Sequence, residues 1–383
     1  MKTIKALLAI CLFTTISLQS QNITNTLGTG GTFTIKSSAA NFFTLNQSTG
    51  NAVFLRNIEL GNIVTSNSTA GMLTKNGISF LHNYAPVGAD GNNTFVGLYS
   101  GNQGMSGTTG QSSNNTGIGF GSLFLNTTGS RNTGLGAFTL LYNTESVDNT
   151  SVGYRSLNLN TTGSANTAVG SESLLNNTIG YENISIGRRS LQYNTAGYRN
   201  TVIGTESMYN NSTGSYNTAI GWYAGDNIFT GNNNIAIGNF TYVPSGSASN
   251  QIRLGNTSIT YAGIQVAWTV TSDRRLKKNI LSSNLGLSFI NKLRPVSYIR
   301  INDESERTEY GLIAQEVEDA LKQEQTENTG MLTVTDDGEY QLRYNDLLAP
   351  MIKAIQELKA ENEELKKRID NLEQKNSQLT NSK

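Results

Sequence analysis

The sequence predicts a mainly β protein: a β-solenoid or β-roll fibre, followed by a small α+β domain that ends in a coiled coil. Three observations support this fold class. The middle of the chain repeats every 17 residues, charge is concentrated after residue 271, and the last segment has a heptad pattern. Residues 83–250 contain seven acids, five bases and 27 asparagines, whereas residues 272–383 contain 20 acids and 17 bases. The chain therefore joins two regions of different composition, one asparagine-rich and almost uncharged and the other highly charged.

Residues 1–20 have the layout of a secretory signal peptide. Lys2 and Lys5 precede an apolar run from Ala6 to Ile16, and a polar exit follows near Ser20. This run is too short to span a bilayer. We therefore expect an exported protein, secreted or at the cell surface, with no transmembrane segment in its mature chain.

The composition disfavours several classes of function. The net formal charge is zero, which gives no electrostatic reason to expect nucleic acid as a partner. Cys11, the only cysteine, lies in the predicted signal peptide, and His82 is the only histidine. We therefore expect no metal centre and no cofactor, and a serine–histidine triad is disfavoured. Hydrolytic chemistry would have to use other groups.

The motif Asn-Thr/Ile-x-apolar-Gly recurs through residues 83–240, and after a first step of 22 residues every step is 17. Seventeen residues suit two short strands and two turns, and such a coil buries its apolar residues only when other coils stack on it. We predict about nine stacked coils, with the apolar fourth residue pointing inward. The first and fourth positions are Asn93, Asn115, Asn132, Asn149, Asn166, Asn183, Asn200, Asn217 and Asn234, and Val96, Ile118, Leu135, Val152, Val169, Ile186, Ile203, Ile220 and Ile237.

Two further positions keep the same phase. We expect repeated asparagines to exchange amide hydrogen bonds along the axis. The core is thin, since about two apolar side chains per coil at about 2 kcal/mol each oppose about 1–2 kcal/mol of backbone entropy per residue. This balance favours lateral association of several chains over a single-chain roll. A disordered linker fits the composition but does not explain the phased apolar positions. The two further positions are Leu123, Leu140, Leu157, Leu174, Leu191 and Met208, and Asn126, Asn143, Asn160, Asn177, Asn194 and Asn211.

Two units, Asn166-Thr-Ala-Val-Gly170 and Asn217-Thr-Ala-Ile-Gly221, resemble the head repeats of trimeric autotransporter adhesins. The resemblance implies a trimer of left-handed β-rolls, although the usual period of that family is shorter. The repeats lack the clustered carboxylates that a glycosidase needs. A glycan or another cell-surface ligand on exposed tyrosines is the alternative to a plain spacer surface. These tyrosines are Tyr154, Tyr181, Tyr198 and Tyr216.

The segments that flank the repeats carry weaker patterns. Residues 21–82 contain short Thr/Ile/Phe alternations, such as Gly31-Thr-Phe-Thr-Ile-Lys36, and we expect β structure there. Residues 241–271 are expected to connect the repeats to the C-terminal domain.

Three separated motifs mark residues 272–350. In this order, next to a heptad helix, they resemble the intramolecular chaperone domain of phage endosialidases and tailspikes (peptidase S74), which is similar to that of myelin regulatory factor. The resemblance implies a domain that folds as a trimer, helps the upstream β-fibre to trimerise, and then cleaves itself off. The motifs are Ser272-Asp-Arg-Arg-Leu-Lys-Lys-Asn-Ile280, Leu293-Arg-Pro-Val-Ser-Tyr298 with Glu309-Tyr-Gly-Leu-Ile-Ala-Gln-Glu-Val317, and Tyr344-Asn-Asp-Leu-Leu348.

Carried over to this sequence, the resemblance places the cut between Thr271 and Ser272, with Ser272 as nucleophile and Lys277 as general base. Serine needs a base to take its proton, and a lysine must be neutral to serve as one, although its reference pKa is about 10.4. Burial at an assembled interface, or nearby positive charge, would lower that pKa. We therefore hypothesise that assembly creates the site.

Four neighbouring residues of these motifs receive supporting roles. Asp273 and Arg275 are placed to orient the scissile turn, whereas Gln315 and Glu316 are interpreted as structural. If the dyad is idle, the domain is a permanent trimerisation clamp on an uncleaved fibre. An enzyme with its site in the β region is the third possibility, and it would need an acidic cleft.

Residues 351–380 have the pattern of a coiled coil. Isoleucine at the first position and leucine at the second favour two strands in isolation, whereas the family resemblance implies three. We expect a homotrimer, because the β-fibre also favours this number. The two heptad positions are Leu348, Ile355, Asn362, Ile369 and Asn376, and Met351, Leu358, Leu365, Leu372 and Leu379.

Overall fold

The computed structural model describes residues 32–36, 41–46, 52–54, 72–327 and 329–380. The chain divides into two units, residues 1–61 and 62–383. In the first unit, β1 (Thr32–Lys36), β2 (Asn41–Asn46) and β3 (Ala52–Phe54) form an antiparallel sheet. Strand β1 coincides with the Thr/Ile/Phe alternation and confirms β structure there. The predicted signal peptide, residues 1–20, lies outside the described residues.

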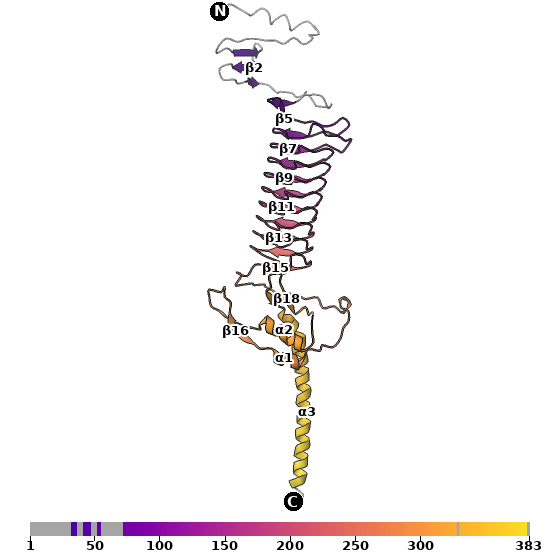
Figure 1. Ribbon diagram of the computed structural model, residues 1–383, viewed down its shortest axis with the longest axis vertical. Coiled ribbons are helices and arrows are strands. Elements are labelled where there is room, and N and C mark those ends of the chain that lie inside the picture. Colours follow the sequence, from indigo (N-terminus) through magenta and orange to yellow (C-terminus); the bar gives the residue numbers. More distant parts are fainter. Residues whose placement is uncertain (1–31, 37–40, 47–51, 55–71, 328, 381–383) are drawn as a thin grey trace, which may run out of the picture. The chain divides into compact units, whose positions relative to one another are not determined.

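The second unit begins with a β-solenoid, which confirms the predicted fold class (Figure 1). A hairpin of β4 (Leu73–Lys75) and β5 (Ile78–His82) opens it, and parallel three-residue strands follow, one per coil. From β7 on, each strand residue pairs with the residue 17 positions further along, as Ala168 does with Ser185. The strands are β6 (Thr94–Val96), β7 (Thr116–Ile118), β8 (Thr133–Leu135), β9 (Thr150–Val152), β10 (Thr167–Val169), β11 (Ile184–Ile186), β12 (Thr201–Ile203), β13 (Thr218–Ile220), β14 (Ile235–Ile237) and β15 (Ile252–Leu254).

The ladder continues one coil past residue 240, where we expected the repeats to end. Strand β15 pairs in register with β14, and Gln251 stands where the other coils have asparagine. Its backbone N–H and its side-chain amide both donate to Asn234 Oδ1, at 2.9 and 3.3 Å. Glutamine therefore preserves the coil-to-coil bond, although this copy lacks the asparagine with which the motif begins.

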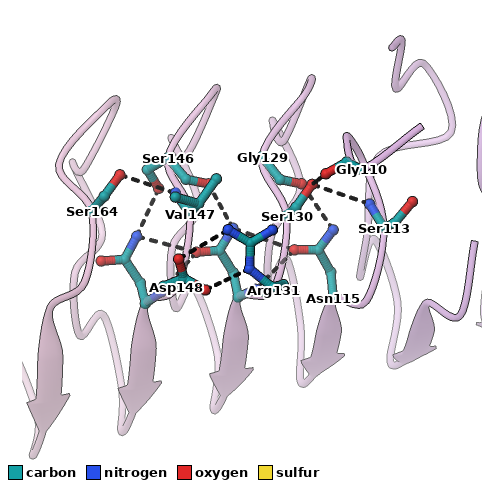
Figure 2. A network of polar contacts seen from close by, with 12 residues as sticks. Gly110, Ser113, Asn115, Gly129, Ser130, Arg131, Ser146, Val147, Asp148 and Ser164 are labelled. Carbon is teal, nitrogen blue, oxygen red and sulfur yellow. Dashed lines mark hydrogen bonds and ion pairs between the residues drawn. The ribbon is translucent and has the colours of Figure 1, made fainter. Parts of the chain in front are cut away.

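Rows of buried asparagines join each coil to the next, as predicted. Asn132 Oδ1 accepts hydrogen bonds from the backbone N–H and the Nδ2 of Asn149, at 3.0 and 3.1 Å. The same Nδ2 donates to the carbonyl oxygen of Gly163, at 2.9 Å. Figure 2 shows this network around Asn115, together with the ion pair of Arg131 and Asp148, which also links adjacent coils. Each amide thus satisfies buried backbone groups in two coils at once.

The second row of asparagines makes a similar chain of bonds. Asn177 Nδ2 donates to Asn160 Oδ1 at 2.8 Å, and Asn211 Nδ2 donates to Asn194 Oδ1 at 2.9 Å. The row ends at Asn211, whose own Oδ1 is buried without a hydrogen-bond partner. The next coil has Ile228 in its place, and this side chain is fully buried. In that coil, an apolar side chain therefore takes the place of the amide.

The prediction that the apolar fourth residues point inward is wrong. Strand residues alternate between faces, and from β6 to β14 the middle residue of the strand is the buried one. The interior beside the leucine row is narrow, so this middle position holds mostly small residues, such as Gly134, Ala168 and Ser185. The fourth residues form an outer apolar row that is half-buried to exposed. This row is Val96, Ile118, Leu135, Val152, Val169, Ile186, Ile203, Ile220, Ile237 and Leu254.

The second apolar position is fully buried, as expected, but it does not lie in a second strand. From Leu123 to Met208 these residues have φ between 44° and 56°, in the left-handed region. That conformation costs an L-residue about 1–2 kcal/mol, which burial of a leucine, at about 1.5–3 kcal/mol, offsets. Each coil therefore contains one strand and a chain of turns, and not the two strands that its length suggested.

The C-terminal part of this unit is a small α+β region. Helices α1 (Leu287–Lys292) and α2 (Ala314–Gln323) accompany two antiparallel pairs, β16 (Val296–Ile299) with β17 (Thr308–Gly311) and β18 (Leu332–Val334) with β19 (Tyr340–Leu342). Two 3-10 turns, η1 (Arg274–Leu276) and η2 (Tyr344–Leu347), flank these elements. Their core is Leu285, Phe289, Val317, Ala320, Leu321, Met331 and Leu347.

The last helix, α3 (Leu348–Thr380), begins three residues before the expected coiled coil. Its first turns pack against α1, where Glu357 accepts the N–H of Leu287 at 2.6 Å and Ala354 is buried. Beyond this contact its heptad residues are exposed in the single chain, as Ile369 and Leu372 are. No helix in the described part of the chain combines the length and apolar character that a membrane span requires.

Replacing one asparagine of the first row should weaken the stack locally. Asn183→Ala removes the acceptor of the Asn200 N–H and the donor to Gly197. We expect a loss of roughly 2–5 kcal/mol in unfolding free energy, because each buried group left unpaired costs about 1–3 kcal/mol. Denaturant unfolding of the full chain measures this loss. Asn239→Ala, at an exposed position, is the matched control, and an equal effect of both would contradict the role of the row.

The first coil should lose stability in mild acid. Burial lowers the pKa of His82 from 6.5, and the neutral ring donates to the carbonyl of Ser100 and accepts from the N–H of Tyr84. The unfolded state binds the proton more readily, so stability is present above about pH 6.5 and is lost as the pH falls below it. The protection factors of the amides in residues 78–97, in which the change of the intrinsic exchange rate with pH is divided out, should therefore fall between pH 7.5 and 5.5. His82→Gln should flatten this dependence, and an unchanged slope would refute it.

Candidate active site

The scissile region predicted from the sequence forms a capped turn. Asp273 precedes η1, and its Oδ1 accepts the backbone N–H of Arg275 at 2.8 Å. The Arg275 guanidinium also pairs with this carboxylate, at 2.6 Å, and these bonds lower the pKa of Asp273. The turn closes when the N–H of Lys277 donates to the carbonyl of Arg274, at 3.1 Å. Asp273 and Arg275 therefore shape the turn.

The turn brings the two predicted catalytic side chains together. Lys277 Nζ lies 2.6 Å from Ser272 Oγ, within the distance of a proton transfer. They are five positions apart in sequence, and the turn brings the later one back to the earlier one. Sequence resemblance named these residues, and the structure places them in hydrogen-bond contact.

The surroundings of the dyad are open. Thr271, Ser272 and Lys277 are all exposed in the single chain. Arg275, whose positive charge was expected to act on Lys277, forms an ion pair with Asp273. The chain alone thus supplies the geometry of a serine–lysine dyad, but not the apolar enclosure that favours a neutral amine.

The second and third of the C-terminal motifs meet at Gly311. The hydroxyl of Tyr344, from the third motif, accepts the N–H of Leu312 at 2.9 Å. A β-carbon at Gly311 would collide with this hydroxyl and lie close to the ring of Tyr298. Glycine is therefore required here to let the first turn of the last motif approach β17. Residues far apart in sequence are thereby combined into one structural unit.

Glu316 makes a structural contact, whereas Gln315 is not part of the buried pair that we expected. Glu316 pairs with Arg294, which joins the start of α2 to the segment before β16. Gln315 is exposed in the first turn of α2. In the described ranges, no group of three or more His, Cys, Asp or Glu residues is arranged to hold a metal ion.

The candidate ligand-binding tyrosines of the repeats fall into two places. Tyr181 and Tyr198 are stacked with centroids 4.7 Å apart, and Tyr216 meets Tyr198 edge-on at 5.2 Å. Tyr154 lies apart from them, against Phe138 at 6.1 Å. A shallow apolar cavity of about 360 Å³ near Phe138 was not predicted. Its signal in the sequence is a set of aromatic and leucine residues in successive coils, namely Tyr99, Phe120, Phe124, Phe138, Leu141 and Tyr142.

Comparison with known proteins identifies one part of the chain. Residues 272–326 match a protein-family model described as chaperone of endosialidase, peptidase S74. The match begins at the predicted nucleophile and ends before the motif of Tyr344, which the structure nevertheless joins to the matched segment. No curated protein and no solved structure matches the chain.

Filling the position of Gly311 should loosen this unit. Gly311→Ala would displace Tyr344 and cost about 1–3 kcal/mol, as overpacking does. Hydrogen exchange of the full chain should quicken in residues 285–347 and stay unchanged in the solenoid. Gly338→Ala is a control with open space around it, although its positive φ adds some local strain. Unchanged exchange in Gly311→Ala would show that the motifs do not depend on this contact.

Proposed function

We propose, from the premise that residues 272–326 form a chaperone domain of the endosialidase type, that this protein is a secreted trimeric fibre with a self-removing assembly domain. The domain would bring three chains together and then cut the bond between Thr271 and Ser272. One observation carries the proposal: Lys277 Nζ lies 2.6 Å from Ser272 Oγ, at the first residue of the matched domain.

The cleavage can be written with groups of this chain and water. Neutral Lys277 takes the proton of Ser272 Oγ, which attacks the carbonyl carbon of Thr271. A C–O bond forms, the C–N bond to Ser272 breaks, and the released amine takes up a proton. Water then hydrolyses the ester, which leaves a carboxylate on Thr271 and restores the hydroxyl of Ser272. The chemistry is a single turnover in cis, with no external substrate.

A need for assembly gives a physical reason why cleavage would wait until the trimer has formed. The dyad is exposed to water in the single chain. Burial against neighbouring copies would remove water from around Lys277 and favour the neutral form. Cleavage would then follow trimerisation, and unassembled chains would keep their chaperone.

Two exposed apolar features support a trimer. The outer apolar row runs along one face of the solenoid sheet, from Val96 to Leu254, and faces solvent in the single chain. The heptad seam of α3 is also exposed. Apolar patches of this extent on a soluble chain mark interaction surfaces, and a leucine seam is complementary to copies of itself.

Export and ligand binding complete the proposal. Export is supported by the layout of residues 1–20, and a surface role by the likeness of the repeats to adhesin heads. A glycan or cell-surface ligand would use the clustered tyrosines, of which Tyr181, Tyr198 and Tyr216 form one patch. The second candidate, an uncleaved fibre with a permanent clamp, is favoured by the exposure of the dyad.

Purified wild type should yield two fragments that part between Thr271 and Ser272. Ser272→Ala and Lys277→Ala should each reduce cleavage by a factor of about 100 or more, since both members of the dyad are needed. Intact-mass spectrometry of each protein measures the fraction cut. Lys278→Ala is the matched control, because it removes the adjacent charge and spares the dyad. A wild type that trimerises and stays whole would support the permanent clamp and refute self-cleavage.

A further inference from the structure

The segment just before the scissile bond has the pattern of a β-strand but forms no strand in the single chain. Apolar and small or polar residues alternate from 264 to 270, which places the apolar ones on one face. Isoleucine, valine, tryptophan and threonine are typical strand formers. The apolar face is Ile264, Val266, Trp268 and Val270, and the other face is Gln265, Ala267 and Thr269.

This apolar face is uncovered. The exposed fraction is 56% for Ile264, 80% for Val266, 75% for Trp268 and 72% for Val270. Within the described part of the chain, the backbone of residues 261–271 makes no hydrogen bond. No charged residue interrupts the sequence between Arg253 and Asp273. An uncharged segment of high strand propensity with unpaired backbone is an aggregation hazard unless another strand covers it.

The backbone decides what kind of partner can cover it. Burying Val266 and Trp268 would also withdraw the peptide groups between them from water, and buried peptide groups need hydrogen-bond partners. A side-chain pocket would cover the apolar side chains but would leave the peptide groups without hydrogen-bond partners. The partner must therefore offer the edge of another strand.

Position in the chain indicates that copies of the same segment supply that edge. The outer apolar row ends at Leu254, ten residues before Ile264, and the segment follows it directly. The heptad seam of α3 begins after the matched domain. The segment thus lies between two surfaces that, in the proposed trimer, face the other copies.

We infer that residues 264–270 form an intermolecular β-strand with the same residues of the other copies, and that this pairing positions the Thr271–Ser272 bond for cleavage. The inference rests on the proposed trimer and deepens it. The strand ends at Val270, next to Thr271, so pairing fixes the carbonyl that Ser272 attacks. The dyad is formed within one chain, whereas its substrate bond is held in place only by assembly.

Hydrogen exchange of the full-length Ser272→Ala protein tests the pairing without depending on cleavage. The amides of residues 265–271 should exchange about 100-fold more slowly in the trimer than in an unstructured peptide of the same sequence. Native mass spectrometry of the same sample gives the number of chains. A trimer in which these amides exchange at the peptide rate would overturn the inference and leave the proposed function standing.

Two neighbouring substitutions test the role in cleavage. Val266→Asp places a charge on the apolar face, and Gln265→Asp places the same charge on the opposite face. We expect Val266→Asp to slow cleavage about 100-fold, as misplacement of a reacting group does, while Gln265→Asp cleaves at the wild-type rate. Circular dichroism confirms that both variants keep the solenoid.

The outcomes separate the inference from the function on which it rests. Equal cleavage by Val266→Asp and wild type, in a trimeric protein, would overturn the inference alone. A wild type that is monomeric and whole would overturn the proposed function, and the inference with it. Protection of residues 265–271 together with slow cleavage of Val266→Asp would establish both steps.

Discussion

Coil-to-coil hydrogen bonding by buried asparagines is the interaction on which the solenoid depends. A coil of 17 residues with one three-residue strand has little backbone in regular pairing and little apolar volume. An amide such as that of Asn149 accepts from the backbone of the next coil and donates to a turn carbonyl. Buried polar groups are thereby satisfied in a low-dielectric interior, where leaving them unpaired is costly. The stack is held by polar rows with a narrow apolar row beside them.

The outer face of the sheet carries apolar side chains that a single chain cannot bury. The interior accepts small residues such as Ala168, so the larger apolar residues of the motif lie outside. The outer apolar row, the segment at 264–270 and the seam of α3 are all exposed on one chain. All three surfaces would be buried by the trimer that we propose. A thin coil and lateral association are therefore two consequences of the same narrow interior.

In the proposed cleavage, a single chain supplies the geometry of the serine–lysine dyad but not the apolar environment around it. A local turn capped by Asp273 is enough to bring Lys277 to Ser272. The apolar surroundings that a lysine base requires are absent around this exposed pair. Chemistry that needs a neighbouring copy to complete its environment is held back until that copy has arrived. Assembly control thus requires no additional regulatory domain.

The sequence by itself determined the period of the repeats, the asparagine rows, the buried leucine row and the long C-terminal helix. Each of these is a fixed spacing in the sequence, and spacing decides which groups stack. The α+β region was predicted from the resemblance of separated motifs to a known family, and not from a spacing. Only the tertiary structure decided that the fourth residues of the motif face outward, that the leucines are left-handed, and that Gln251 continues the ladder. Three residues of strand are too few for periodicity to say which face is inside. The width of the interior decides it, and that width exists only once the coils have stacked.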